Sequence, residues 1–173
     1  GGVRSVQDVR ALLRAGADKV AVNTAALKQP ALITAIAQAF GRQCMVLSVQ
    51  AKRRPGGGWE AYFDNGREHS GRDAVAWAAE GAQRGAGEIL LTSVDAEGCR
   101  RGMDTELVAA VCAAVDVPVV AAGGLAGAED AAAAANAGAA AVAAASALHY
   151  GTQTVQSLKQ GLAALGVEVR PCE

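Results

Sequence analysis

The stretch GGVRSVQDVRALLRAGADKVAVNTAA (residues 1–26) decides the fold, because it occurs twice in the chain. The second copy, GGLAGAEDAAAAANAGAAAVAAASAL (residues 123–148), keeps the same spacing without a gap. Alanine matches carry little weight in so alanine-rich a chain. The comparison therefore depends on the paired glycines, the aspartate, the later glycine, the valine and the Thr/Ser pair. Chance would rarely place all of these in one register, and we interpret the two stretches as an internal repeat.

Each copy predicts a loop, a helix, a second loop and a short strand that ends near a hydroxyl side chain. Glycines let backbone N–H groups approach an anion closely, and a hydroxyl at the next strand end adds a donor beside a helix N-terminus. Each copy therefore predicts a phosphate site built from two neighbouring loops. A simpler alternative is that Thr24 and Ser146 only cap the helices that follow them.

Composition limits the class of protein. A chain of 173 residues fits one domain with its own core, and a net charge of −1 does not indicate nucleic acid or an acidic membrane surface. The cysteines form no Cys-x-x-Cys pair, so neither a disulfide framework nor a zinc site is indicated; they are Cys44, Cys99, Cys112 and Cys172. We expect a reduced cytoplasmic protein without a cofactor or metal. The chain begins within a loop motif and without methionine, so we expect an upstream segment to be missing.

Strands and helices are predicted to alternate along the chain. Strands are expected at residues 19–23, 44–49, 88–93 and 117–121, with a fifth that ends near residue 145. Helices are expected at residues 5–15, 30–40, 70–85, 105–114 and 155–165, with Ser5 and Ser70 as N-caps. Asn65-Gly66 is a hairpin signal, so residues 51–66 are predicted to form a small β-excursion. This order favours right-handed βαβ units and a parallel sheet, and the repeat favours a barrel over an open sheet.

Several motifs together resemble one family. They are Gly-Gly-Val-Arg-Ser at 1–5, Asn-Thr-Ala-Ala at 23–26, Ala-Lys-Arg at 51–53, Gly-Ala-Gly-Glu-Ile-Leu-Leu-Thr-Ser-Val-Asp at 85–95 and Gly-Val-Glu-Val-Arg at 166–170. The chain resembles the cyclase subunit of imidazole glycerol phosphate synthase, from the end of the third barrel strand onward. The resemblance implies an incomplete (β/α)8 TIM barrel, a single partial domain over residues 1–173 that lacks the first strands.

The family implies a lyase of histidine biosynthesis that works with a glutaminase subunit. Ammonia released by that partner passes through the barrel to a ribonucleotide substrate with a phosphate at each end. The products are imidazole glycerol phosphate and an aminoimidazole carboxamide ribotide. A substrate with two phosphates fits the two sites inferred from the repeat.

The resemblance also assigns residues by position. Gly2, Asn23 and Thr24, the first loop set, would hold one phosphate. Gly124, Ala145 and Ser146, the second loop set, would hold the other. Asp95 matches an active-site aspartate, although alone it would more often be a turn residue. Asp18 and Lys19 match positions at the opposite mouth, where the partner binds and ammonia enters.

Gln50 departs from the family pattern, because it stands where the family has one of its two acid–base aspartates. A carboxamide has no proton to give or take near neutral pH, and loss of general acid–base help costs ~10²–10⁴ in rate. The other aspartate would lie on the first strand, outside this sequence. We therefore predict that the chain as given is inactive.

Two alternatives remain open from the residues. The sister phosphoribosyl isomerase of the same pathway shares the half-barrel repeat and a substrate with two phosphates. A non-catalytic phosphate-binding remnant would keep both loop sets without chemistry.

Overall fold

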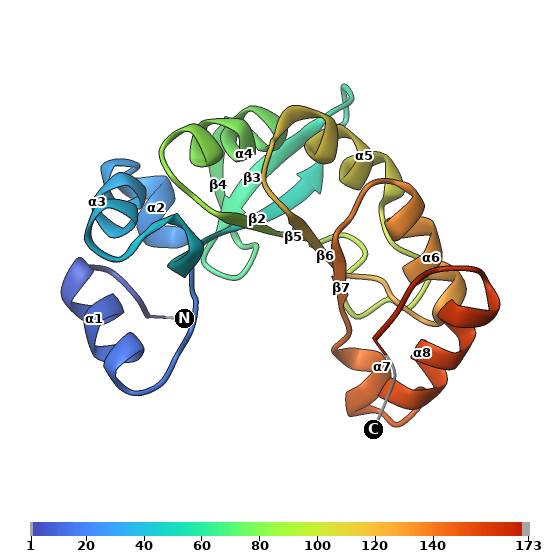
Figure 1. Cartoon of the computed structure of the whole chain (residues 1–173). Coiled ribbons are helices and arrows are strands. Elements are labelled where there is room, and N and C mark those ends of the chain that lie inside the picture. The colour runs from blue at the N-terminus through green and yellow to red at the C-terminus, as the bar shows by residue number, and fades with distance from the viewer. Residues whose placement is uncertain (1, 171–173) are drawn as a thin grey trace.

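The computed structural model describes residues 2–170, and its backbone alternates strands with helices (Figure 1). Five strands run parallel in the spatial order β1-β2-β5-β6-β7. They are β1 (Val20–Val22), β2 (Met45–Arg53), β5 (Glu88–Ser93), β6 (Val119–Ala122) and β7 (Ala141–Ala143). Their mostly apolar, continuous sequences are typical of strands covered on both faces. The expected α/β fold with parallel strands followed by helices is confirmed.

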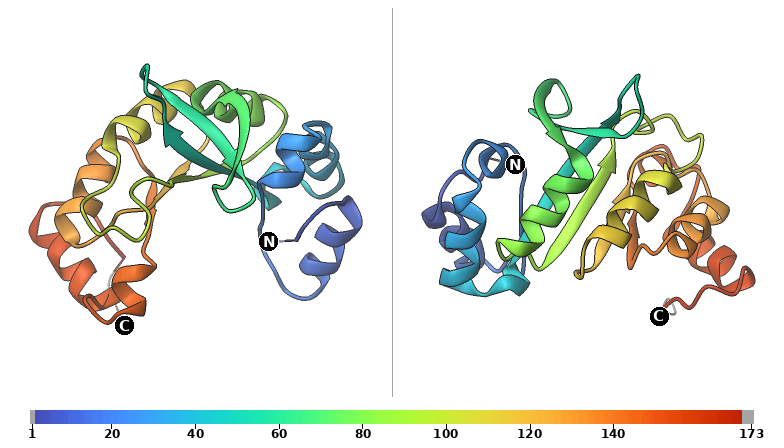
Figure 2. Two further views of the ribbon diagram at one scale, coloured as in Figure 1. Left: turned by 180° about the vertical axis from the view of Figure 1, so that it is seen from behind. Right: turned by 90° about the horizontal axis from the view of Figure 1, so that it is seen from above.

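The helices follow the outer side of the curved sheet, and the whole forms an open arch (Figures 1 and 2). They are α1 (Val6–Arg14), α2 (Thr24–Lys28), α3 (Ala31–Phe40), α4 (Ala74–Gln83), α5 (Thr105–Ala114), α6 (Ala128–Asn136), α7 (Ser146–His149) and α8 (Val155–Ala164), with a 3-10 turn, η1 (Arg42–Cys44). Helices α1 to α3 lie at one end of the arch and α6 to α8 at the other. Among residues 2–170, β1 and β7 do not pair with each other, so the sheet stays open.

A hairpin interrupts the alternation after β2. Strands β3 (Trp59–Phe63) and β4 (Glu68–Asp73) are antiparallel, and β3 pairs with residues 50–53 of β2. Strand β1 pairs with residues 45–47 of β2, while β5 occupies the opposite edge of β2. Strands β1 and β3 therefore share one edge of β2, and the C-terminal end of β3 lies next to the C-terminal end of β1, where the Asn23 side chain donates to the Tyr62 carbonyl. This arrangement brings the hairpin to the C-terminal end of β1.

The core is uneven along the chain. Its larger part lies between the sheet and helices α3, α4 and α5, with Trp77, Ile33 and Leu47 fully buried. The smaller part lies under α6 and α8, where Ala131, Ala132 and Ala147 take positions among a few leucines. Alanine buries little apolar surface, so the C-terminal end of the arch has the thinner core.

Most predicted elements are present, and several boundaries need correction. Helix α5 and strand β5 have the predicted bounds, and α1 begins after Ser5, whose side chain accepts from Asp8 N in a capping box. The β-excursion continues past residue 66 to Asp73. Ser70 lies in β4 and caps nothing; Asp73 is the N-cap of α4 and accepts from Ala76 N at 2.9 Å. Strand β2 runs on to Arg53, because pairing with β3 extends it.

Three further expectations can be placed. Cys44, Cys99 and Cys112 are free thiols, whereas Cys172 and Gly1 lie outside the described residues. No helix within residues 2–170 has the length and apolar character needed to cross a membrane. Neither Thr24 nor Ser146 is an N-cap, since Asn23 and Ala145 precede their helices and make no side-chain cap bond. The simple capping alternative is therefore wrong for both hydroxyls.

Candidate functional site

A cavity of about 1080 Å³ lies at the C-terminal ends of β1 and β2. Gly2, Asn23 and Thr24, which form the first loop set, all line it, together with Gln50. The other lining residues come from the start of the chain, from β1 and β2, from α2 and from the hairpin, and they include Arg4, Lys28, Phe63, Asp64 and Glu68. The structure thus brings together four residues that were predicted separately from the sequence.

Asn23 is held at the wall of this cavity by its side chain. Its Nδ2 donates to Gln50 Oε1 at 3.0 Å and to the backbone oxygen of Tyr62 at 3.1 Å. Both amide hydrogens are therefore used inside the protein. The Asn23 Oδ1 atom is buried without a partner among the described residues. Because the Asn23 side chain has no free donor, a phosphate at this position would accept hydrogen bonds only from backbone N–H groups.

Thr24 begins α2, and its hydroxyl connects that helix to the hairpin. Its Oγ1 accepts from the backbone N–H of Asp64 at 3.3 Å. The hydroxyl proton stays available for an anion in the cavity. The hairpin tip is fixed further by Gly66, which has a φ of +75° and is buried against Val94. The tip therefore lies over the strand ends.

The second loop set lies at the ends of β6 and β7 and does not line the cavity. Gly124 is buried, and its carbonyl accepts from Gly102 N at 3.1 Å. A Cβ at Gly124 would overlap the Gly102 carbonyl oxygen, so only glycine fits under this segment. Ala145 is exposed and Ser146 begins the short helix α7. The two loop sets are related by the repeat, yet only the first is part of a described cavity.

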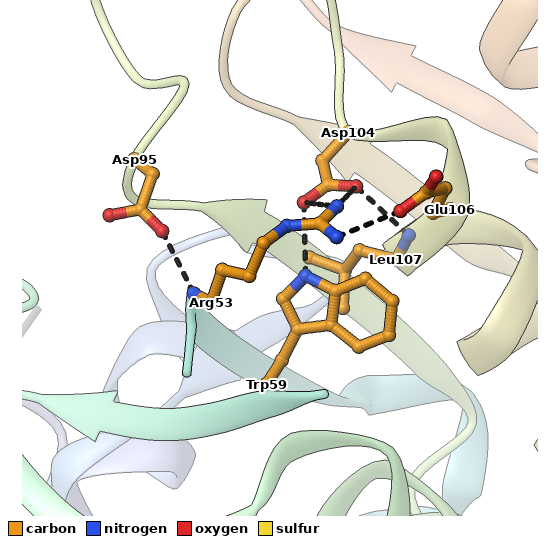
Figure 3. Close-up of polar contacts among 6 residues, drawn as sticks. All are labelled: Arg53, Trp59, Asp95, Asp104, Glu106 and Leu107. Carbon is orange, nitrogen blue, oxygen red and sulfur yellow. Dashed lines mark hydrogen bonds and ion pairs between the residues drawn. The ribbon is translucent and has the colours of Figure 1, made fainter. Parts of the chain in front are cut away.

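Asp95 follows β5 in a turn, and one of its carboxylate oxygens is already used. Its Oδ2 accepts from the backbone N–H of Arg53 at 2.8 Å (Figure 3). The Arg53 side chain turns the other way and bonds Asp104 and Glu106 at the start of α5. Hydrogen bonding by Glu106 and the charge of Asp104 raise the pKa of Arg53 above its usual range. Sequence patterns did not indicate this cluster, because Arg53 meets Asp95, Asp104 and Glu106 through the pairing of β2 with β5 and meets Trp59 through the pairing of β2 with β3.

Asp18 and Lys19 lie at the other end of the sheet, just before β1 begins. Lys19 Nζ is 2.6 Å from Glu88 Oε2, at the first residue of β5. The Lys19 side chain is 51% exposed and that of Glu88 19% exposed, so water screens the pair only in part. The predicted partner-facing residues thus lie at the N-terminal ends of the strands, and the predicted substrate-facing residues lie at the C-terminal ends.

The hairpin also holds a polar cluster that sequence reasoning missed. Tyr62 is buried and its hydroxyl lies 2.8 Å from His69 Nδ1, while His69 lies 3.4 Å from Glu60 Oε2. The backbone N–H of Gly71 donates to Glu60 Oε1 at 2.8 Å and lowers the pKa of that carboxyl. Burial raises the pKa of Tyr62. Glu60 and Tyr62 are two residues apart on β3, so their side chains lie on the same face of the strand. In so short a strand this alternation is too weak a signal to predict the contacts from the sequence.

Parallel strand–helix units with glycine loops at their carboxyl ends define an α/β protein of the (β/α)-barrel class. A family model described as "Histidine biosynthesis protein" matches residues 1–154, and the chain belongs to this family.

Individual relatives agree with the family match. The chain is 56% identical over 175 residues to "Imidazole glycerol phosphate synthase subunit HisF" of Beutenbergia cavernae, covering 98% of this chain and 68% of the relative. The protein of the same name from Legionella pneumophila is 58% identical over 130 residues, covering 75% of this chain and 61% of the relative. That from Mycobacteroides abscessus is 52% identical over 176 residues, covering 98% and 68%. The chain thus spans about two thirds of the length of these relatives. Their names agree with the resemblance and do not favour the isomerase alternative.

Proposed function

We propose that this chain is the substrate-holding part of a cyclase subunit of imidazole glycerol phosphate synthase. The observation that carries the proposal is the cavity of about 1080 Å³ lined by Gly2, Asn23, Thr24 and Gln50. The names of the relatives support the reaction, which converts a ribonucleotide with two phosphates into imidazole glycerol phosphate and an aminoimidazole carboxamide ribotide. The proposed location of this function is the cytoplasm.

The first loop set would hold one phosphate of that substrate. Backbone N–H groups of Gly2 and Asn23 and the hydroxyl of Thr24 would donate to its oxygens. Arg4 and Lys28 line the same cavity and bring positive charge toward an anion. Their attraction outweighs the repulsion by the neighbouring Asp64 and Glu68 only if the phosphate lies closer to Arg4 and Lys28. The second loop set, Gly124, Ala145 and Ser146, would hold the other phosphate.

Between the two phosphates, the chain would offer Asp95 and Gln50 to the reacting part of the substrate. Asp95 keeps Oδ1 free of hydrogen bonds to the described residues, so it has an oxygen for a ligand. Gln50 can orient a group by hydrogen bonding but cannot transfer a proton. We therefore propose that a cyclase subunit with Gln50 at this position still binds the substrate but loses most of its turnover.

The partner would be a glutaminase subunit that docks at the N-terminal ends of the strands. Asp18 and Lys19 lie there, and the Lys19–Glu88 pair connects the starts of β1 and β5 across β2, which lies between them. Ammonia from the partner would pass along the sheet from this end to the cavity.

The test joins the chain to the part of the Beutenbergia relative that precedes the region of similarity. Cyclisation is assayed with ammonium as the nitrogen source, with Gln50 retained and with Gln50→Asp, and substrate binding is measured by calorimetry. We expect binding in both chimeras and turnover ~10²–10⁴ lower with Gln50 than with Gln50→Asp. Equal turnover would contradict the role given to Gln50. Absence of substrate binding in both folded chimeras would overturn the proposed function, and binding without turnover in both would identify a non-catalytic phosphate-binding protein.

A further inference from the structure

One residue contacts both ends of the segment that joins β5 to α5. The segment runs from Asp95 to Asp104, and Arg53, the last residue of β2, lies beside both of them (Figure 3). The Arg53 backbone N–H donates to Asp95 Oδ2 at 2.8 Å. Its Nη2 donates to Asp104 Oδ1 at 3.0 Å and to Oδ2 at 3.2 Å.

The contact with Asp104 is more than an exposed ion pair. The Asp104 side chain is 15% exposed, against 72% for Glu106, which accepts from Arg53 Nη1 at 2.8 Å. Trp59 Nε1 also donates to Asp104 Oδ2 at 3.0 Å, and the Arg53 guanidinium lies 4.9 Å from the centre of the Trp59 ring. A planar guanidinium that stacks on a ring and donates through its two Nη atoms to two carboxylates has little rotational freedom. Asp104 is thus held by fixed donors from β2 and β3.

Asp104 also determines where α5 begins. It is the N-cap of α5, and its Oδ1 accepts from Leu107 N at 3.1 Å. Leu107 is buried in the core. The end of the segment is therefore connected to the core through the helix and to the site through Arg53.

The middle of the segment reaches the second loop set. Gly102 N donates to the Gly124 carbonyl at 3.1 Å, and the two backbones approach so closely that Gly124 has no room for a side chain. Residues 95–99 form turns, residues 100–104 are neither helix nor strand, and Arg100 has a φ of +50°. A segment of turns has few bonds of its own, so its position depends on its anchors.

We propose that Arg53 is a positioning residue that fastens both ends of the segment 95–104 to the end of β2 and thereby sets where the Asp95 carboxylate stands. The backbone bond to Asp95 could be made by any residue except proline. The side chain supplies the second anchor, at Asp104, where the Trp59 indole N–H also donates, and the Gly102–Gly124 bond holds the middle of the segment. The geometry is independent of the proposed function; only the use of Asp95 toward a substrate depends on it.

The experiment uses the full chain, and its first variant leaves residue 53 unchanged. Asp104→Asn keeps an N-cap acceptor for α5 and removes the charge that binds Arg53. Glu97→Gln is the matched control, since Glu97 lies in the same segment and its side chain makes no hydrogen bond or ion pair within residues 2–170. Two quantities are measured by NMR: hydrogen exchange of the Gly102 amide, and the chemical shift of the Arg53 amide proton. Asp95→Asn provides the shift of that proton without a carboxylate partner.

We expect Asp104→Asn to speed exchange of the Gly102 amide roughly 10-fold, with exchange in β2 and α4 unchanged. The Arg53 amide proton should move toward its position in Asp95→Asn, which loss of overall stability alone would not cause. Arg53→Ala should speed Gly102 exchange at least as much, and Arg53→Lys should lie between it and wild type. If Arg53→Ala fails to fold, Asp104→Asn and Arg53→Lys still decide the matter. Gly102 exchange and an Arg53 amide shift that both match Glu97→Gln would overturn the proposal, as would an equal rise of exchange throughout the chain.

Discussion

Asn23 Nδ2 donates to Gln50 Oε1 across 3.0 Å, and this bond decides what Gln50 offers to the cavity. The same nitrogen donates to the Tyr62 carbonyl, which can only accept, so the Asn23 amide has one possible orientation. Gln50 must then turn its oxygen toward Asn23. Its Nε2 is the group left for a ligand, so a position where the family resemblance implies an aspartate presents a donor in this chain.

Removing the Asn23 amide should destabilise the fold. In Asn23→Leu, the Tyr62 carbonyl and the Gln50 oxygen lose their donor, and a partly buried acceptor without a partner costs about 1–3 kcal/mol. Denaturant unfolding measures the loss. Asn136→Ala, at the exposed end of α6, is the control and should change stability by less than about 0.5 kcal/mol. A loss in Asn23→Leu no larger than in the control would show that the two bonds are not formed in solution.

Gly2 and Gly124 occupy equivalent positions in the repeat and should respond differently to alanine. Their φ angles are +88° and +93°, so both substitutions carry the cost of a left-handed alanine, about 1–2 kcal/mol. A Cβ at Gly2 meets no atom within 4 Å, whereas one at Gly124 overlaps the Gly102 carbonyl. Gly124→Ala should therefore cost roughly 1–3 kcal/mol more than Gly2→Ala in denaturant unfolding. Equal costs would mean that the segment 95–104 does not lie on Gly124.

The sequence was most informative where one local signal acts alone. Ser5 and Asp8 form a reciprocal cap, and α5 has its predicted bounds, because capping and helical periodicity are local. Ser70 was the wrong cap because pairing of β4 with β3 extended the strand beyond it. Tertiary pairing overrode a local preference there, as it did at the end of β2.

The site shows the same division. The repeat and the family motifs brought out Gly2, Asn23, Thr24 and Gln50, which line one cavity. No pattern indicated that Arg53 faces Asp104, since those two residues are far apart in sequence and meet only because β2 pairs with β5, which leads into the segment that ends at Asp104. Gly2 and Gly124 are equivalent in the repeat, but this did not reveal that Gly124 is covered by the segment 95–104, because that segment belongs to neither copy.

Glu60 should make the free energy of unfolding decrease as the pH falls into the acid range. The Gly71 N–H, together with His69 and Arg54, lowers the pKa of Glu60 in the folded chain below its usual value. A lowered folded pKa adds stability above the unfolded pKa, and this stability is lost as the pH falls through the folded pKa. Glu60→Gln should thus be less stable than wild type near neutral pH and converge with it in acid. Urea unfolding measured across this pH range checks the prediction. Glu68 is exposed on β4, and the control Glu68→Gln should show no such convergence with wild type. A stability difference between Glu60→Gln and wild type that stays the same at every pH would refute the prediction.

Thr24 should matter more than Ser146 for a small phosphate ester, since only Thr24 lines the described cavity. A hydroxyl that donates to a phosphate contributes about 1.5–3 kcal/mol, so Thr24→Val should weaken binding of ribose 5-phosphate roughly 10-fold or more. Thr24→Ser keeps the hydroxyl that accepts from Asp64 N and should bind nearly as wild type. Ser146→Ala should have a smaller effect, measured in the same calorimetric titration. A larger loss in Ser146→Ala than in Thr24→Val would place the stronger phosphate site at the ends of β6 and β7 instead.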